Sequence, residues 1–107
     1  MTNSKKQASL LPAYLVVGED ALKRATVLER LRRRLAEHGD LSFNSDTFEG
    51  EVAAGADVVS ACNTMPFASD VRLVLVRDVD KLKKADSEEL VAYLKAPSDQ
   101  TVLALEA

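Results

Sequence analysis

The stretch Asn-Thr-Met-Pro-Phe-Ala-Ser-Asp-Val-Arg-Leu-Val-Leu-Val, residues 63–76, decides how the rest of the chain is interpreted. Residues 71–76 are the clearest apolar run in the sequence, and we expect them to form a central strand. Before that strand, Met65, Pro66 and Phe67 stand side by side in a connection. Connections are normally polar and exposed, because their backbone groups must reach water. Two explanations are open at this point: Met65 and Phe67 fold back and cap the core, or they form a short hydrophobic plug that binds another protein.

Length and composition predict one small globular domain with a single core. The chain has 107 residues, of which 47% are hydrophobic and 29% charged, as in an ordinary globular protein. The net charge of −3 argues against a domain that binds nucleic acid through bulk charge, but it does not exclude a local basic strip. Cys62 and His38 are the only residues of their types, so we expect no disulfide and no metal site. No apolar run approaches the about 20 residues of a membrane span, and no signal peptide precedes Pro12, so a cytoplasmic protein without membrane contact is expected.

The first half of the chain alternates between apolar runs and an amphipathic segment. Residues 13–17 form a continuous apolar run that ends at Gly18, which is typical of a strand buried on both faces. A helix then begins at Asp20, a good N-cap, and ends near Gly39. Its apolar stripe recurs at spacings of three and four residues and consists of Leu22, Ala25, Leu28, Leu31 and Leu35.

The second half continues the alternation. Residues 41–48 predict an edge-like strand with Phe43 and Phe48 as its anchors. Residues 56–63 predict a short helix that buries Val58, Val59 and Cys62 on one side. After the central strand, Asp86 and Glu89 resemble a capping box, and the helix that follows carries Leu90, Val91 and Leu94 inward.

The last apolar run, residues 101–105, predicts a fourth strand after Pro97. Strands that alternate with helices imply right-handed crossovers. The sequence therefore predicts an α/β fold with a three-layer, mostly parallel sheet of four strands.

One face of the first helix is basic. It carries Lys23, Arg24, Arg30, Arg32, Arg33 and Arg34, interleaved with Glu29 and Glu37. Such a face is most simply a solvated surface, although it could also meet phosphates or an acidic partner.

A strand that ends in Gly18 and leads into a helix raises the question of a phosphate-binding loop. That loop follows the pattern G-x-x-x-x-G-K-[ST], in which backbone N–H groups and a lysine surround the phosphates. With Gly18 as the first glycine, Lys23, Arg24 and Ala25 stand where Gly, Lys and Ser or Thr are required. Glu19 and Asp20 also place two carboxylates where a phosphate would lie, which costs a few kcal/mol through repulsion of like charges. We therefore expect no bound nucleotide.

The central strand also lacks the acidic pair that holds magnesium in nucleotide hydrolases. That motif has four apolar residues followed by Asp-Glu, whereas here residues 73–76 are followed by Arg77 and Asp78. Asp78 and Asp80 could be considered as a metal pair, but the neighbouring Lys81 and Arg77 favour surface ion pairs. No other catalytic arrangement of side chains is present in the sequence, so no catalytic, cofactor or metal residue is predicted.

The ordered set of these segments resembles the delta subunit family of the bacterial DNA polymerase III clamp loader. The resemblance covers nearly the whole chain and corresponds to the N-terminal domain of that family. It rests on residues 14–20 (Tyr-Leu-Val-Val-Gly-Glu-Asp), 44–50 (Asn-Ser-Asp-Thr-Phe-Glu-Gly), 64–69 leading into 71–76, and 80–82 (Asp-Lys-Leu). The resemblance implies an AAA+-type domain, similar to P-loop NTPases, that has lost its nucleotide motifs.

The resemblance also implies a site and partners. In the family, the connection before the third strand inserts a small apolar residue and a Phe into a hydrophobic cleft on the sliding clamp. Phe67 matches that Phe, and Pro66 occupies the position before it. Some members have Leu there, so Pro66 departs from that version of the pattern, and Met65 could supply the missing apolar contact. The implied clamp-binding residues are therefore Met65, Pro66 and Phe67.

The implied function is that of a clamp loader delta subunit without ATPase activity, which binds and helps to open the sliding clamp (beta subunit) for loading on DNA. Its implied partners are the clamp, the delta prime and tau/gamma subunits and, through the assembly, DNA. It would have no catalytic site of its own within the DNA-directed DNA polymerase III holoenzyme, a nucleotidyltransferase complex. The alternative is a fragment of a divergent nucleotide-dependent P-loop enzyme, an ATPase or kinase.

Domain boundaries complete these expectations. Residues 1–12 are expected to be a flexible N-terminal segment, and residues 13–107 an AAA+-like N-terminal domain. The chain stops directly after an apolar run that reads as a strand, which indicates a longer protein truncated at its C-terminal end.

Overall fold

The structure, a computed structural model, describes residues 10–107, so most of the expected flexible segment, residues 1–9, lies outside the described residues. The strands are β1 (Ala13–Val16), β2 (Ser45–Glu49), β3 (Arg72–Arg77) and β4 (Thr101–Glu106). The helices are α2 (Ala21–Ala36), α3 (Gly55–Cys62), α4 (Lys84–Leu94) and the short 3-10 helix η1 (Val79–Lys81). Except for η1, the predicted alternation of strands and helices is confirmed.

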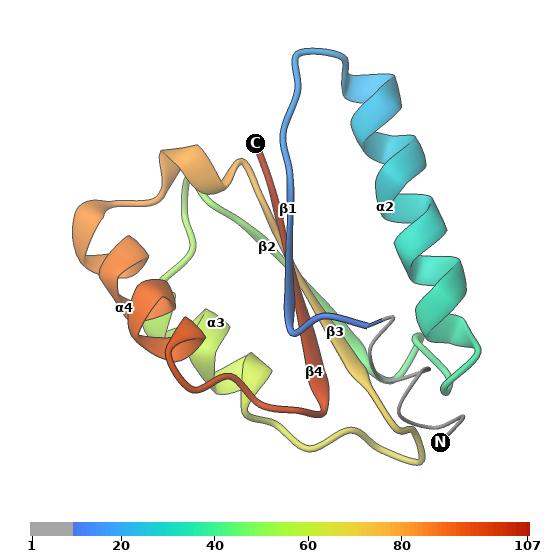
Figure 1. Ribbon diagram of the computed structural model, residues 1–107. Coiled ribbons are helices and arrows are strands. Elements are labelled where there is room, and N and C mark those ends of the chain that lie inside the picture. Colours follow the sequence, from blue (N-terminus) through green and yellow to red (C-terminus); the bar gives the residue numbers. More distant parts are fainter. Residues whose placement is uncertain (1–9) are drawn as a thin grey trace.

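The four strands form one parallel sheet in the order β1-β4-β3-β2. Helix α2 covers one face of the sheet, and α3 and α4 cover the other (Figure 1). This arrangement is the predicted three-layer α/β fold with crossover helices. Because parallel strands all start at the same edge, the connections that precede β2, β3 and β4 meet at one edge of the sheet. We refer to it as the N-terminal edge.

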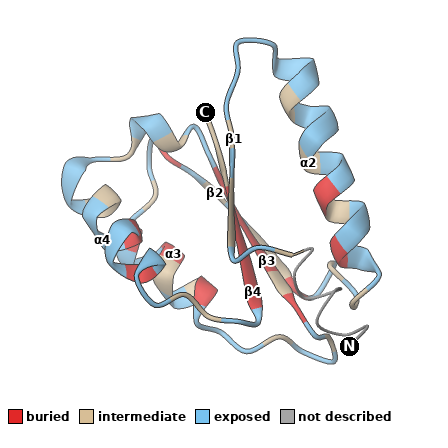
Figure 2. Cartoon of the chain, in the orientation of Figure 1, coloured by how far each residue is buried: buried red, intermediate tan, exposed pale blue. Residues whose placement is uncertain are grey.

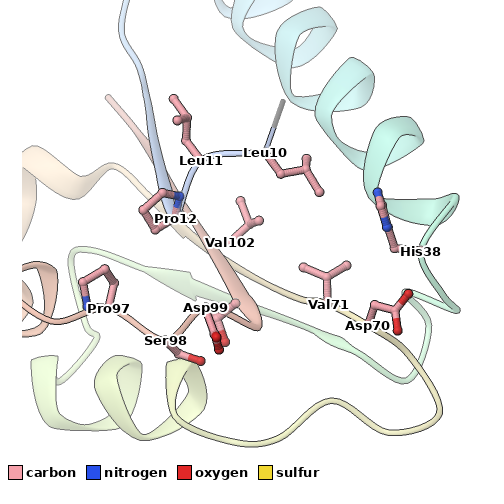
Figure 3. A pocket seen from close by; sticks show the side chains of 11 residues that line it. Leu10, Leu11, Pro12, His38, Asp70, Val71, Pro97, Ser98, Asp99 and Val102 are labelled. Carbon is pink, nitrogen blue, oxygen red and sulfur yellow. The ribbon is translucent and has the colours of Figure 1, made fainter. Parts of the chain in front are cut away.

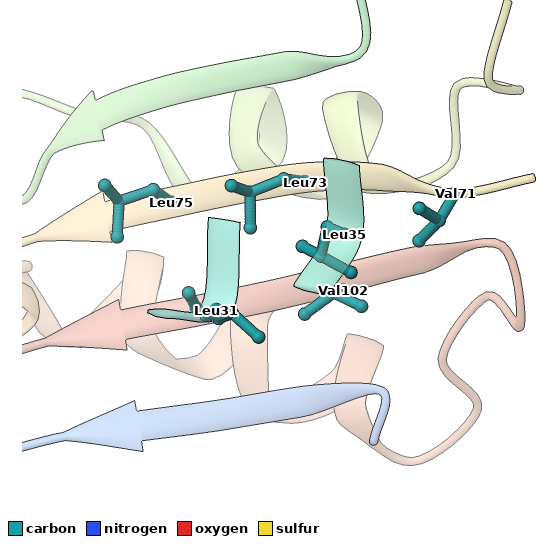
Figure 4. Close-up of a cluster of buried hydrophobic side chains, with 7 residues drawn as sticks. Leu31, Leu35, Val71, Leu73, Leu75 and Val102 are labelled. Carbon is teal, nitrogen blue, oxygen red and sulfur yellow. The ribbon is translucent and has the colours of Figure 1, made fainter. Parts of the chain in front are cut away.

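The core lies on both faces of the two central strands, and burial is concentrated there and on the inner sides of the helices (Figure 2). Successive side chains of a strand point to opposite faces, so β3 and β4 supply both halves of the core. The cluster under α2 (Figure 4) consists of Leu31, Leu35, Val71, Leu73, Leu75, Val102 and Ala104. The cluster under α3 and α4 consists of Val58, Cys62, Val74, Val76, Leu90, Tyr93 and Leu103.

Several sequence expectations about burial in the first half of the chain are wrong. Strand β1 is not buried on both faces: it pairs only with β4, at an edge of the sheet, and 63% of Leu15 is exposed. Leu22, the first residue of the predicted apolar stripe, is 80% exposed, and Ala25, the second, is exposed as well. Figure 1 shows the reason, since the first turn of α2 extends beyond the ends of the strands.

The predicted capping box at the start of α4 is also wrong. The helix begins at Lys84, and its N-cap residue Lys83 makes no capping side-chain hydrogen bond. The Asp86 carboxylate instead accepts a hydrogen bond of 2.9 Å from the Gly55 N–H, so it caps α3, the neighbouring helix. A side chain at Gly55 would have no room, because its Cβ would lie 2.5 Å from the Asp86 carbonyl oxygen.

This close approach of α3 to α4 also determines which side of α4 is buried. Leu90 and Tyr93 face the core, whereas 57% of Val91 and 38% of Leu94 are exposed, contrary to the expectation. Tyr93 thus takes the inward position that the sequence pattern assigned to its neighbours.

Cys62 is fully buried at the end of α3, as the sequence predicts. Removal from water penalises the thiolate and raises the pKa of the Cys62 thiol from 9.0 to about 11. Since the thiolate is the reactive form, the thiol is inert in the folded domain.

We expect substitution of Leu35 by Ala to lower the free energy of unfolding by about 2–5 kcal/mol, because it leaves a cavity in a fully buried site. Leu22→Ala is the matched control: it makes the same change in the same helix at an 80% exposed position, and we expect a change within about 0.5 kcal/mol. Urea denaturation measures both. Equal losses for the two variants would contradict the assigned core.

We expect Cys62 to react with iodoacetamide only when the domain unfolds. A pKa rise from 9.0 to about 11 lowers the thiolate fraction at mildly alkaline pH about 100-fold, and burial blocks access as well. The raised pKa also makes the free energy of unfolding depend on pH, because above pH 9 the thiol ionises more readily in the unfolded chain than in the folded domain. The stabilisation by the neutral thiol is therefore fully present below pH 9 and is lost as the pH rises towards 11. Mass spectrometry with and without urea measures the labelling, and equally fast labelling under both conditions would contradict the buried position.

Candidate functional site

The connection between α3 and β3, residues 63–71, lies at the N-terminal edge of the sheet (Figure 1). Two of its apolar side chains point into solvent: Met65 is 75% exposed and Phe67 is 71% exposed. Pro66, between them, is half-buried. The explanation that Met65 and Phe67 fold back and cap the core is therefore wrong. An exposed Met and an exposed Phe, separated by one residue, form a small apolar surface, which we call the plug (Met65, Pro66 and Phe67).

The backbone of the plug is attached to the protein by Asn44, which lies just before β2 and is fully buried. The Asn44 Oδ1 accepts a hydrogen bond of 2.6 Å from the Phe67 N–H, and the Asn44 Nδ2 donates one of 2.8 Å to the Phe67 carbonyl oxygen. The same Nδ2 donates to the Asp40 carbonyl oxygen at 2.8 Å. One buried side chain thus binds both polar groups of the Phe67 main chain. Sequence reasoning missed this role of Asn44.

Both ends of the connection are also held by hydrogen bonds. On the α3 side, the Thr64 hydroxyl donates to the Ser60 carbonyl oxygen at 2.8 Å. On the β3 side, the Asp70 N–H donates to the His38 carbonyl oxygen at 3.1 Å, and the Ser69 hydroxyl donates to the Val71 carbonyl oxygen at 2.8 Å. The main chain of the plug is therefore held in place by hydrogen bonds, whereas the side chains of Met65 and Phe67 are exposed to solvent.

Ala68, directly after Phe67, has a φ of 51°. This left-handed conformation is unfavourable for an Ala, and it persists only where the surrounding structure enforces it. The hydrogen bonds of Phe67 and Ser69 on either side supply that enforcement. The strained residue directly follows the plug, and backbone strain of this kind is found most often at functional sites.

The turn that carries Asn44 differs from the sequence expectation. Strand β2 begins at Ser45, and Phe43 is not a buried anchor but is 68% exposed. The Asp40 carboxylate explains the difference, because it accepts hydrogen bonds from the Ser42 hydroxyl (2.6 Å) and the Ser42 N–H (2.8 Å) and so closes a turn. The hydrogen bond from the Ser42 hydroxyl, and to a smaller extent the one from the Ser42 N–H, lowers the pKa of Asp40. The predicted edge position of β2 and the packing of Phe48 against the core are confirmed.

At the opposite edge, the place where a phosphate-binding loop would lie is occupied by the protein itself. The Asp20 carboxylate accepts hydrogen bonds from the Leu22 N–H (2.9 Å) and the Lys23 N–H (3.2 Å), the amides that would otherwise face an anion. The Arg24 guanidinium donates to the Gly18 carbonyl oxygen and pairs with Glu106 at 3.1 Å. The charge of Arg24 is thus paired with a carboxylate at the end of β4.

The last residue of β3 and the residues that follow the strand make ion pairs. Arg77 pairs with Glu106 at 3.7 Å, and Asp78 pairs with Lys81 at 4.0 Å, which agrees with the predicted surface role of Asp78. Among residues 10–107, no group of three potential ligands could hold a metal ion. In the same part of the chain, no helix is long and apolar enough to cross a membrane.

The basic face of α2 is largely a solvated surface. Arg30 and Arg33 are exposed, and Arg33 pairs with Glu29 at 3.5 Å, one turn away. Arg33 and Arg34 lie in the last turn of the helix, where positive charge is favourable next to the helix dipole.

A cavity of about 830 Å³ lies near the plug, between the segment before β1, the end of α2 and the loops before β3 and β4 (Figure 3). Its wall includes two side-chain hydroxyls, and both make structural hydrogen bonds. Ser98 accepts from the Gln100 N–H at 3.2 Å, and Thr101 donates to the Cys62 carbonyl oxygen at 2.6 Å. Among the described residues that line the cavity, neither of these hydroxyls is hydrogen-bonded to a basic side chain.

Comparison with known proteins identifies the family. The family model of the DNA polymerase III delta subunit matches residues 14–107. A curated relative, DNA polymerase III subunit delta of Bacillus subtilis, is 25% identical over 110 residues, which is 95% of this chain and 32% of the relative.

Solved structures agree in fold. The DNA clamp loader delta protein of Bacillus subtilis superposes with a TM-score of 0.80 at 25% identity, over 99% of this chain and 34% of its own. A DNA polymerase III gamma subunit-related protein of Thermotoga maritima superposes with a TM-score of 0.75 at 17% identity, over 99% of this chain and 38% of its own. The second likeness concerns the fold alone.

This chain therefore spans about a third of the length of the delta relatives it matches. The family model nevertheless covers nearly all of this chain, because the matched residues 14–107 run from β1 through β4. The chain belongs to the DNA polymerase III delta subunit family.

Proposed function

We propose that this domain is the part of a clamp loader delta subunit that binds the sliding clamp, the beta subunit, and helps to open it for loading on DNA during replication. The observation that carries the proposal is the plug: Met65 and Phe67 are exposed on a backbone that the buried Asn44 holds in place. Membership of the delta subunit family supports it.

The plug has the right physical properties to anchor a protein partner. Transfer of one large apolar side chain from water into a cleft contributes about 1.5–3 kcal/mol, so a Met and a Phe together contribute about 3–6 kcal/mol before ordering costs. Aromatic anchors at the centre of an interface commonly dominate its binding energy. Phe67 is therefore the principal anchor of the proposed site, Met65 its partner, and Pro66 a restraint on the backbone between them.

Opening a ring requires more than binding to it. The delta subunit must bind the open clamp more tightly than the closed clamp, because equal affinity for both forms would shift no population. A plug with a fixed backbone suits this task, since a rigid anchor can transmit the strain that distinguishes the two forms.

The domain performs this role without nucleotide chemistry of its own. The Asp20 carboxylate accepts hydrogen bonds from the amides of α2 that could otherwise bind an anion, and Arg24 is paired with Glu106. Both contacts support a subunit without ATPase activity. In this proposal the domain works together with other clamp loader subunits, delta prime and tau/gamma, and it meets DNA only through the assembly. As a replication protein it would act in the cytoplasm.

We expect Phe67→Ala to weaken binding of the sliding clamp about 10- to 100-fold, from the loss of about 1.5–3 kcal/mol of apolar burial. Met65→Ala should weaken it to a smaller extent. Surface plasmon resonance with the full-length protein and the clamp of the same organism measures both. Leu22→Ala is the control: Leu22 is 80% exposed, and it belongs to the first turn of α2, which lies at the opposite edge of the sheet (Figure 1).

Unchanged affinity of the Phe67→Ala variant would contradict the proposed site. Equal weakening by Phe67→Ala and Leu22→Ala would show a general surface effect and would contradict it as well.

We expect calorimetric titration of the domain with Mg-ATP to give no saturable heat, because the Asp20 carboxylate already accepts hydrogen bonds from the Leu22 and Lys23 N–H groups and places negative charge where a phosphate would bind. An ATPase with an intact phosphate-binding loop serves as the positive control. Saturable binding would favour the alternative function, a divergent nucleotide-dependent enzyme.

A further inference from the structure

We propose that Asn44 is a positioning residue for clamp binding: its buried amide fixes the backbone of Phe67, so that the plug is already in its binding conformation before the partner arrives. This inference rests on the proposed function of the plug. It adds a residue that is remote in sequence and cannot touch the partner, because none of its surface is exposed.

The hydrogen bonds of Asn44 show what its side chain is used for. A primary amide has two N–H donors and an acceptor oxygen, and Asn44 uses both ends of its amide. The Oδ1 accepts from the Phe67 N–H (2.6 Å), and the Nδ2 donates to the Phe67 and Asp40 carbonyl oxygens (2.8 Å each). Two of the three bonds thus go to the main chain of one exposed residue.

The main chain of Asn44 is itself part of the sheet. Its carbonyl oxygen accepts a hydrogen bond of 2.8 Å from the Leu73 N–H, and its N–H donates to the Leu41 carbonyl oxygen at 3.2 Å. Leu73 belongs to β3 and is buried in the core cluster under α2. A continuous path of hydrogen bonds therefore runs from the central strand through Asn44 to the backbone of Phe67.

The side chain of Phe67 cannot hold the loop in place, because it is 71% exposed. The Asn44 amide is consequently the contact that restrains Phe67 itself, together with the unfavourable left-handed φ of 51° at Ala68. A flexible plug would have to lose conformational freedom on binding, and a plug ordered beforehand avoids part of that loss. Asn44 thus contributes to affinity by restricting the free protein.

A double-mutant cycle tests this inference, with full-length protein carrying Asn44→Ala, Phe67→Ala or both substitutions. We expect Asn44→Ala to weaken clamp binding about 3- to 10-fold, the size of a local ordering cost. In the Phe67→Ala background the same substitution should weaken binding less than about 2-fold, because there is no longer an anchor to position. A residue with a merely structural role would produce the same factor in both backgrounds.

Two further variants separate positioning from stability. Tyr93→Phe removes a different part-buried hydrogen bond, the one that the Tyr93 hydroxyl accepts from the Ser98 N–H at 3.1 Å, and should leave clamp affinity unchanged. Asn44→Ser stays neutral at this fully buried position, but its single short hydroxyl cannot bind both the Phe67 N–H and the Phe67 carbonyl oxygen. It provides the test if Asn44→Ala does not fold, which circular dichroism shows, and it should also weaken binding.

The outcomes distinguish this inference from the proposed function. If Phe67→Ala leaves binding unchanged, the proposed site is wrong. If Phe67→Ala weakens binding but folded Asn44 variants bind as tightly as the natural protein, or weaken binding equally in both backgrounds, the positioning role alone is overturned.

Discussion

The hydrogen bond from the Leu73 N–H to the Asn44 carbonyl oxygen joins the centre of the sheet to the exposed plug. It begins the parallel pairing of β2 with β3, which places the turn before β2 next to the connection before β3. Because both connections lie at the N-terminal edge, the Asn44 side chain can reach the Phe67 main chain over a separation of 23 residues. The burial of β3 thus stabilises both the fold and the geometry of the plug.

The fold could be predicted from the sequence because its strongest signals are local. The apolar runs of β3 and β4 and the periodic Leu residues of α2 depend only on neighbouring residues. What could not be predicted depends on tertiary neighbours. An apolar run does not show that β1 lies at the edge of the sheet, and an acidic residue near a helix start does not show that Asp86 caps α3 rather than its own helix.

The same division applies to the site. Met65, Pro66 and Phe67 could be singled out because apolar residues in a connection are unusual, but their exposure required the structure. Asn44 gave only a weak signal, a polar residue between Phe43 and the start of β2, because its partners lie far away in the sequence. The prediction that this domain binds no nucleotide rests partly on Asp20, and the structure adds a contact: the Asp20 carboxylate accepts hydrogen bonds from the Leu22 and Lys23 N–H groups, which a bound phosphate would need.

The central claim is that Phe67 enters an apolar cleft on the sliding clamp. A structure of the full-length protein bound to the clamp of the same organism tests it most directly, through the exposure of Phe67, which is 71% in the free domain. The account predicts that the Phe67 side chain is buried against the clamp while its main chain keeps both hydrogen bonds to Asn44. A complex in which the Phe67 side chain stays in solvent would contradict the account.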